Sequence, residues 1–134
     1  MSTAAKERNH AEENAAAWLQ SIEQMMQRLE TAQEQAVTGP DETDAVLTEI
    51  QESPLSVQVR GGWHRPGEAD TEGPYEYEIL LSTGGPALRI IGQIGDHNEP
   101  SSAELQWQDW GTPWTRFPAP EATLLTFAQQ FYFG

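Results

Sequence analysis

The chain has 134 residues, of which 21 are Asp or Glu and 7 are Lys or Arg, and its formal net charge at pH 7 is -14. A field of this sign repels nucleic acid and anionic membranes, which argues against direct binding to either and favours a basic protein surface as partner. Because cysteine is absent, the sequence provides neither a disulfide nor a thiolate zinc site. The length suits one domain with a modest core.

The first third of the sequence predicts a long amphipathic helix. Between Ala4 and Ala36 there is no Pro or Gly, and Ala, Glu and Gln, which favour helices, are frequent. Apolar residues recur at alternating intervals of four and three, at Trp18, Ile22, Met25, Leu29, Ala32 and Ala36. Before Ala15 this stripe disappears, so we expect the first dozen residues to fray or project. The stripe packs either on the rest of the domain or on another helix, in a hairpin or a dimer.

A second, shorter helix is expected after a break at Thr38-Gly39-Pro40, because Gly suits a helix C-terminus and Pro cannot continue the helix. Asp41 or Thr43 would cap this second helix, which runs through Ile50. The Ser53-Pro54 step then ends it.

From Leu55 onward, apolar and polar residues alternate, which is typical of strands. Four strands are expected, over residues 55–60, 75–81, 87–94 and 103–109. The Thr83-Gly84-Gly85-Pro86 segment predicts a tight hairpin because its two glycines tolerate positive φ. In the second strand, alternation places Glu76 and Glu78 outward and four apolar residues inward: Tyr75, Tyr77, Ile79 and Leu81.

A C-terminal helix is expected from Glu121 to Tyr132, with one apolar face made by Leu124, Leu125, Ala128, Phe131 and Tyr132. The predicted fold is therefore α+β: a long N-terminal helix, a short second helix, a four-stranded antiparallel meander sheet and a C-terminal helix packed on the sheet. Residues 1–53 would form the helical arm and residues 54–134 the sheet with its helix. Together they would make one compact domain.

Blocks of acidic residues are the first candidate site. One block lies on the arm at Glu7, Glu12 and Glu13. Two further blocks are predicted to bind a partner, and their members are Asp41, Glu42, Asp44, Glu49 and Glu52, and then Glu68, Asp70, Glu72, Glu76 and Glu78. Carboxylates on helix turns spaced roughly 5.4 Å apart can imitate the phosphates that a basic channel holds. The alternative is a solvated face that keeps the protein in solution.

A tryptophan cluster is the second candidate. Trp107, Trp110 and Trp114 fall within eight residues, and strand alternation sends the first two to opposite faces. We expect Trp107 to be buried beside Leu105, and one of Trp110 and Trp114 to be exposed as a partner-binding residue. The alternatives are tryptophans that cover a sheet edge or the core rim, and a sugar-binding platform.

No segment carries a specific catalytic or metal-binding signature. His64 and His97 lie in predicted loops near carboxylates, where they would either form an acid–base or metal site or simply be exposed. The Ser and Thr residues show no nucleophile elbow, and Ser82-Thr83-Gly84-Gly85 lacks the Lys of a phosphate-binding loop. We therefore predict that the protein is not an enzyme and uses no cofactor or metal. Without a signal-like start or a long apolar run, it should be soluble and intracellular.

Three segments, Ser53–Arg65, Tyr77–Ile90 and Gln108–Thr115, resemble small acidic proteins encoded by bacteriophages and prophages. The likeness covers roughly residues 53–134 and carries no assigned catalytic residues. It implies an inhibitor of anti-CRISPR or anti-restriction type in the cytoplasm of a bacterial host cell.

These observations together predict a non-enzymatic protein that binds and inhibits a basic, nucleic-acid-binding host protein, occupying its channel as a mimic of nucleic acid. The alternative is a structural or assembly protein that forms a homodimer through the N-terminal helix. In that case Ile22, Met25 and Leu29 would face another chain.

Overall fold

The computed structural model describes residues 10–39, 41–61, 63, 65–67, 74–83, 86–109 and 111–133. In chain order its elements are α1 (His10–Gln35), α2 (Thr43–Glu52), β1 (Ser56–Gly61), β2 (Pro74–Ser82), β3 (Ala87–Gln93), a short 3-10 helix η1 (Asp96–Asn98), β4 (Glu104–Gln108), β5 (Thr115–Phe117) and α3 (Glu121–Ala128). The predicted α+β class and element order are confirmed. The sheet, however, has five strands instead of four.

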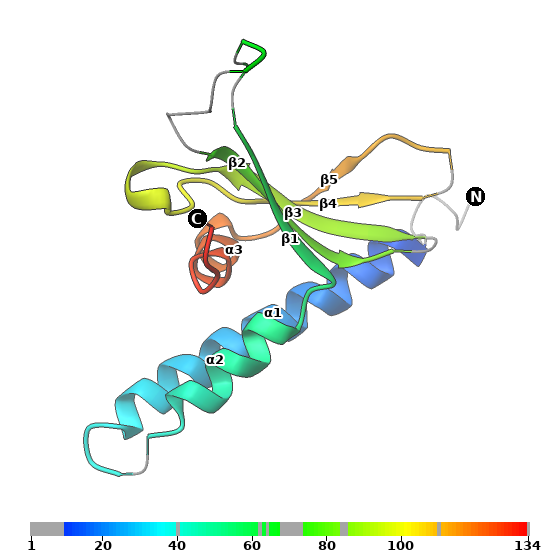
Figure 1. Ribbon diagram of the computed structural model, residues 1–134. Helices are drawn as coiled ribbons and strands as arrows, with labels where there is room; N and C mark the ends of the chain where they lie inside the picture. Colours follow the sequence, from blue (N-terminus) through cyan, green and yellow to red (C-terminus); the bar gives the residue numbers. More distant parts are fainter. Residues whose placement is uncertain are drawn as a thin grey trace, which may run out of the picture.

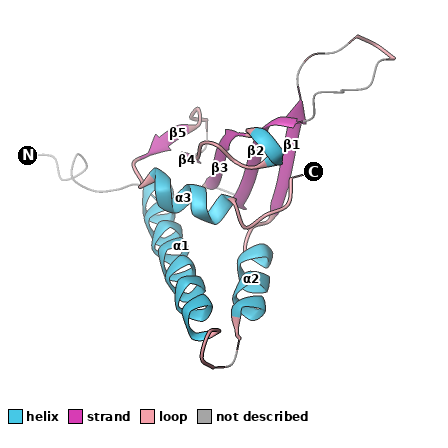
Figure 2. Cartoon of the chain, turned by 90° about the vertical axis from the view of Figure 1, so that its left-hand side faces the viewer, coloured by secondary structure: helices cyan, strands magenta, loops and turns pink. Residues whose placement is uncertain are grey.

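The sheet is an antiparallel meander in which the strands lie side by side in the order β1-β2-β3-β4-β5. Helices α1 and α3 pack on one of its faces, and α2 lies alongside α1 (Figures 1 and 2). The sequence does not reveal β5 because this strand has three residues, Thr115–Phe117, with Pro113 and Pro118 close to its ends. Three residues are too few to show an alternation of apolar and polar side chains. The extent of β5 is therefore set by its pairing with β4.

Helices α1 and α2 form an antiparallel hairpin that extends away from the sheet (Figure 2). The buried residues of α1 keep the predicted spacing of four and three, and they are Ala11, Ala15, Ile22, Met25, Leu29 and Ala32. The expectation that the stripe ends before Ala15 is wrong, because the small side chain of Ala11 is fully buried. Of the first dozen residues, where fraying was predicted, residues 10–12 belong to α1 and residues 1–9 lie outside the described part of the chain.

The dimer hypothesis depends on three residues of this stripe, Ile22, Met25 and Leu29. Their exposed fractions within the single chain are 0%, 7% and 4%. They belong to the same buried cluster as Val46 and Ile50 of α2. The chain's own elements therefore cover them, while a homodimer through α1 stays an untested prediction.

The core lies between the sheet and the helices. Its largest fully buried side chains are Ile22, Ile50, Ile79, Leu88, Ile90, Leu105, Leu124 and Phe127. Within β2, Tyr77, Ile79 and Leu81 point inward as predicted, whereas Tyr75 is 39% exposed. The prediction for Tyr75 is wrong because this residue is the second of β2, next to the irregular pairing of Pro74 with Gly61 at the end of β1.

Tyr77 and Gly92 make a close contact between β2, β3 and the chain before β4. The Tyr77 hydroxyl donates a hydrogen bond of 2.6 Å to the Ser102 carbonyl oxygen, and burial raises the pKa of Tyr77 well above its usual range. A Cβ atom at Gly92 would lie 2.0 Å from the same carbonyl oxygen. Glycine is therefore needed in β3 for this close approach.

The C-terminal helix α3 ends at Ala128, four residues before the predicted end at Tyr132. Beyond it the chain turns, so that Tyr132 is 87% exposed while Phe133 is buried. The Phe133 ring packs on Tyr77 with centroids 5.0 Å apart. The expected place of Tyr132 on the apolar face is therefore wrong, because packing of Phe133 on the sheet ends the helix early.

Candidate functional site

The first candidate surface is the acidic hairpin, which we define as residues 10–53 and which comprises α1, α2 and their connection. Its sequence contains ten acidic residues and one arginine, Arg28. The acids are Glu12, Glu13, Glu23, Glu30, Glu34, Asp41, Glu42, Asp44, Glu49 and Glu52. The hairpin therefore has nine more acids than Lys and Arg, a large share of the chain's net charge of -14.

Arg28 joins the two helices by pairing with Glu49. Its two terminal nitrogens donate to the two carboxylate oxygens over 2.8 and 2.6 Å, so the contact is bidentate. These hydrogen bonds lower the pKa of Glu49 and raise the pKa of Arg28. Glu49, one of the predicted partner-binding residues, is thus neutralised within the chain.

Asp41 also has a structural contact. Its Oδ1 accepts a 2.9 Å hydrogen bond from the backbone N–H of Thr43, at the first residue of α2. Hydrogen bonds from Thr43 lower the pKa of the Asp41 carboxyl group. Asp41 therefore satisfies an N–H at the helix start, but the prediction that Asp41 or Thr43 is the N-cap is wrong, because Glu42 occupies that position and Thr43 is the first helical residue.

The other acids of the predicted block, Glu42, Asp44 and Glu52, are exposed. Within the described part of the chain, no Lys or Arg forms an ion pair with them. The same holds for Glu23, Glu30 and Glu34 of α1, which are also exposed.

Glu23, Glu30 and Glu34 do not stand out in the sequence because they are scattered along the chain. Their intervals of seven and four residues nevertheless place them on one side of α1. This helical spacing is the signal that would have identified them.

Two shallow grooves follow one side of the acidic hairpin, with Arg28 lining one and Glu49 the other. The groove nearer the sheet has a volume of about 470 Å³ and is lined by Asn14, Ala17, Trp18, Ser21, Met25, Glu49, Glu52 and Ser53. The second, of about 440 Å³, includes Glu42 and Val46 in its lining. The first groove thus combines apolar surface from Trp18 and Met25 with carboxylates of α2, a combination that suits a side chain with an apolar stem and a cationic end.

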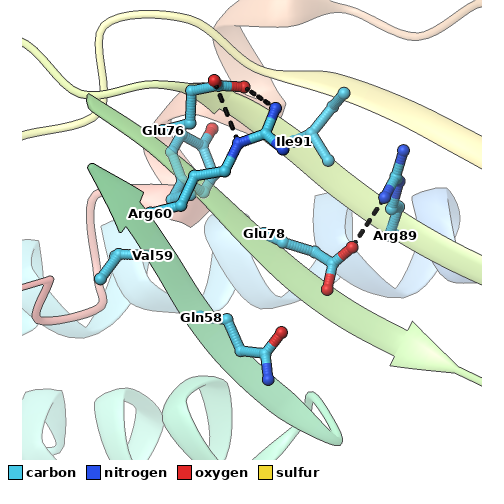
Figure 3. Close-up of a pocket in the computed structure, with 8 residues that line it drawn as sticks. Gln58, Val59, Arg60, Glu76, Glu78, Arg89 and Ile91 are labelled. Atoms are coloured by element: carbon cyan, nitrogen blue, oxygen red, sulfur yellow. Dashed lines mark hydrogen bonds and ion pairs between the residues drawn. The ribbon is translucent and has the colours of Figure 1, made fainter. Parts of the chain in front are cut away.

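The second candidate surface is the face of the sheet opposite the helices. A pocket of about 260 Å³ lies across β1, β2 and β3, with Gln58, Arg60, Glu76, Glu78 and Arg89 around it (Figure 3). The nitrogens of Arg60 donate to both Glu76 oxygens over 3.1 and 2.9 Å, and these contacts raise the pKa of Arg60.

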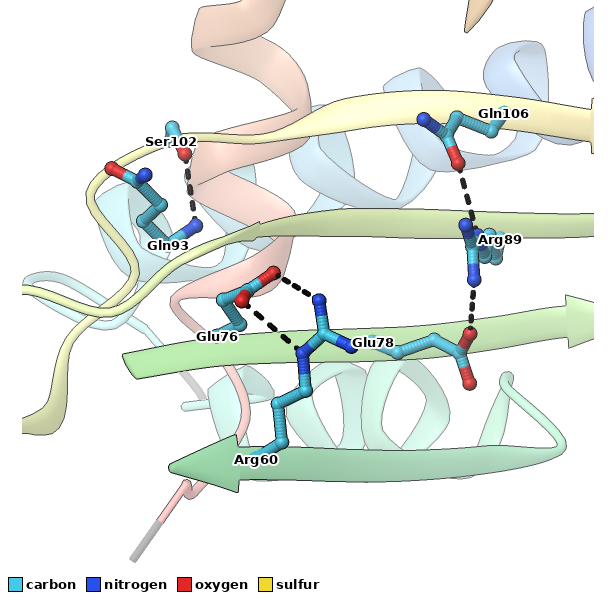
Figure 4. Close-up of polar contacts among 7 residues, drawn as sticks. All are labelled: Arg60, Glu76, Glu78, Arg89, Gln93, Ser102 and Gln106. Atoms are coloured by element: carbon cyan, nitrogen blue, oxygen red, sulfur yellow. Dashed lines mark hydrogen bonds and ion pairs between the residues drawn. The ribbon is translucent and has the colours of Figure 1, made fainter. Parts of the chain in front are cut away.

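Polar contacts continue across this face of the sheet (Figure 4). Arg89 donates to Glu78 over 2.8 Å and to Gln106 over 3.0 Å, so it links β2, β3 and β4. At the far edge Arg116 of β5 lies 3.8 Å from Glu104 of β4. Glu76 and Glu78, both predicted to bind a partner, are therefore each paired with an arginine of a neighbouring strand.

The tryptophan cluster differs in part from its prediction. Trp114 is half-buried, and the Arg89 guanidinium lies 4.0 Å from the centre of its ring. Trp107 is also only half-buried, although it packs against the core beside buried Leu105. The expectation of a buried Trp107 is wrong because this residue lies one position before the end of β4, at the rim of the core.

Several predicted residues lie outside the described part of the chain: Glu7, His64, Glu68, Asp70, Glu72 and Trp110. His97 is exposed and has a positive φ of 61°. Among the residues that the structure describes, no group of three or more His, Asp or Glu could hold a metal ion. In the same residues, no helix has both the length and the apolar character needed to cross a membrane.

No protein-family model matches this chain, and no curated protein or solved structure is significantly similar to it. The resemblance to bacteriophage proteins therefore stays a prediction. The exposed surfaces of the chain therefore provide the main basis for a functional inference.

Proposed function

We propose that this protein binds a basic surface of another protein through its acidic hairpin, and that this surface is one that otherwise holds nucleic acid. The observation that carries the proposal is the difference in pairing between carboxylates. On the sheet, Glu76, Glu78 and Glu104 each have an arginine partner. The hairpin has ten acids for one arginine.

Charge density supports mimicry of a single strand more than mimicry of a duplex. Helix α1 has 26 residues, which corresponds to a length of about 39 Å at about 1.5 Å per residue. With α2 packed alongside, the hairpin carries one net negative charge for about every 4 Å of its length. Nucleic acid carries one charge per about 3.4 Å of a single strand and per about 1.7 Å of a duplex.

Three further parts of the proposal rest on the sequence resemblance alone. They are that the partner is a host protein, that binding inhibits it and that this chain comes from a bacteriophage. The assembly alternative, a dimer through α1, has less support. Its three key residues are buried by this chain's own core. We therefore place the binding surface on the exposed carboxylates of the hairpin.

Capture from a bacterial lysate, followed by elution with a single-stranded oligonucleotide, tests this function. The wild-type chain should retain proteins that the oligonucleotide displaces, and retention should fall steeply between 50 and 500 mM salt because counterions are released on binding. Replacing Glu23, Glu30 and Glu34 with Gln, together with Glu42→Gln and Asp44→Asn, should reduce this retention by at least about tenfold.

The matched control neutralises Asp96 and Glu99, which are exposed acids in the connection between β3 and β4. Asp96→Asn with Glu99→Gln should leave retention nearly unchanged, and the pair Glu42→Gln with Asp44→Asn provides the comparison at equal charge change. Equal losses in the two pairs would show that overall charge acts instead of a specific surface. Retention that no oligonucleotide displaces would refute nucleic-acid mimicry.

A further inference from the structure

The two edges of the sheet differ in how well they are protected. β5 has three residues, with Pro113 and Pro118 near its ends, and short edges next to proline discourage strand addition. β1 at the opposite edge has six residues and no proline within it. Alternate residues of an antiparallel strand turn their N–H and C=O groups away from the neighbouring strand. In the described part of the chain, no other segment pairs with this outer edge of β1.

The side chains along β1 also leave apolar surface uncovered. Val57 and Val59 lie opposite Ile79 and Tyr77 of β2, so they belong to the face that the helices cover. Val59 is nevertheless 46% exposed, and Leu55, which precedes the strand, is 61% exposed. Three apolar residues at every second position thus follow an edge that none of the described helices fully covers.

The β1 edge lacks the acidic residues that would make two copies of this chain repel each other. Residues 53–67 include two arginines, Arg60 and Arg65, and no acid, in a chain with a net charge of -14. Arg60 is neutralised by its bidentate contact with Glu76. Repulsion between two copies is therefore weaker here than at the acidic hairpin.

The order of the apolar residues is self-complementary. In an antiparallel pairing centred on Val57, Leu55 of one copy lies opposite Val59 of the other, and the two Val57 residues face each other. Each apolar side chain then has an apolar cross-strand neighbour, which is the type of pair that stabilises sheets. The irregularity in register at Arg60 and Gly61 lies outside this five-residue match.

We propose that two copies of the chain join their β1 edges antiparallel about a two-fold axis at Val57, so that one sheet continues into the other. This interface is separate from the acidic hairpin and does not depend on the function proposed for it. The five-residue match, 55–59, includes no residue of the acidic hairpin, so the dimer would carry two acidic surfaces.

Sedimentation equilibrium of the full chain tests the dimer. The wild type should reach twice its mass of 14.9 kDa. Leu55→Lys with Val59→Lys places charges opposite apolar side chains and should raise the dissociation constant at least about tenfold. The matched control is Val37→Lys with Tyr132→Lys, at residues that are 83% and 87% exposed. This control should remain dimeric, and circular dichroism should show that both variants are folded.

Disulfide formation tests the register, because the wild-type chain has no cysteine. A mixture of Leu55→Cys and Val59→Cys chains should form a mixed disulfide on oxidation. Neither variant alone should do so, since identical positions would be about 14 Å apart in this register, too far for a disulfide. A wild-type chain that stays monomeric at millimolar concentration would overturn the proposal. So would a double-lysine variant that dimerises with unchanged affinity, or a Leu55→Cys chain that forms a disulfide with a second copy of itself.

Discussion

The acidic hairpin and the open face of the sheet both carry Glu side chains, but these side chains have different surroundings. On the sheet, cross-strand neighbours lie about 4.5–5.5 Å apart, and Arg60 and Arg89 meet Glu76 and Glu78 from adjacent strands. In the hairpin, Arg28 is the sole arginine among residues 10–53 and is already paired with Glu49. The lesson is that the number of carboxylates in a segment does not locate a binding surface. We propose that the number left without a counter-charge does.

A large test of this comparison asks whether the hairpin and the sheet are one folding unit. Ile22 of α1 and Leu105 of β4 are both fully buried, so Ile22→Ala and Leu105→Ala should each lower the free energy of unfolding by about 2–5 kcal/mol. Because both residues belong to one cluster, either change should shift a single transition seen by circular dichroism and by tryptophan fluorescence.

Exposed Val37 supplies the control for these two substitutions. Val37→Ala should change the free energy of unfolding by no more than about 0.5 kcal/mol, because this side chain is 83% exposed. Two separate transitions in the Ile22→Ala variant would show that the hairpin folds independently and that the comparison concerns two domains.

Removing a single carboxylate should change the free energy of unfolding by a smaller amount, with opposite signs in the two regions. Glu78→Gln deprives the mostly buried Arg89 of its ion pair and should lower the free energy of unfolding by about 1 kcal/mol. Glu34→Gln instead removes repulsion with Glu30 one helical turn away, and should raise the free energy of unfolding by about 0.2–0.5 kcal/mol at low salt. Chemical denaturation at 20 mM salt would resolve the two signs, and destabilisation by both changes would contradict the comparison.

The smallest effect concerns pH and the one arginine of the hairpin. Contact with Arg28 lowers the pKa of Glu49 below the ordinary 4.5, so the folded state binds this proton less readily than the unfolded state. The stabilisation should therefore be fully present above pH 4.5 and lost as the pH falls through the lowered pKa. A double-mutant cycle with Arg28→Gln and Glu49→Gln would measure it, and coupling that is as strong at pH 2 as at pH 7 would disprove this origin.

Local patterns in the sequence determined much of the fold. The intervals of four and three residues predicted α1 and its buried face, because side chains that recur with the helical period lie on the same side. Alternation likewise predicted β2 and the inward direction of Tyr77 and Ile79. These features depend on neighbours in the chain, so one sequence was sufficient to find them.

The candidate surfaces depended on contacts between distant residues. The register of β1 on β2 brings Arg60 to Glu76, 16 residues away, and the packing of α2 on α1 brings Arg28 to Glu49. Position at the sheet edge likewise leaves Val59 exposed although its strand pattern resembles a buried one. Composition determined that the protein is acidic, but tertiary structure decided which carboxylates stay unpaired, because a charge can be neutralised by a side chain from any part of the fold.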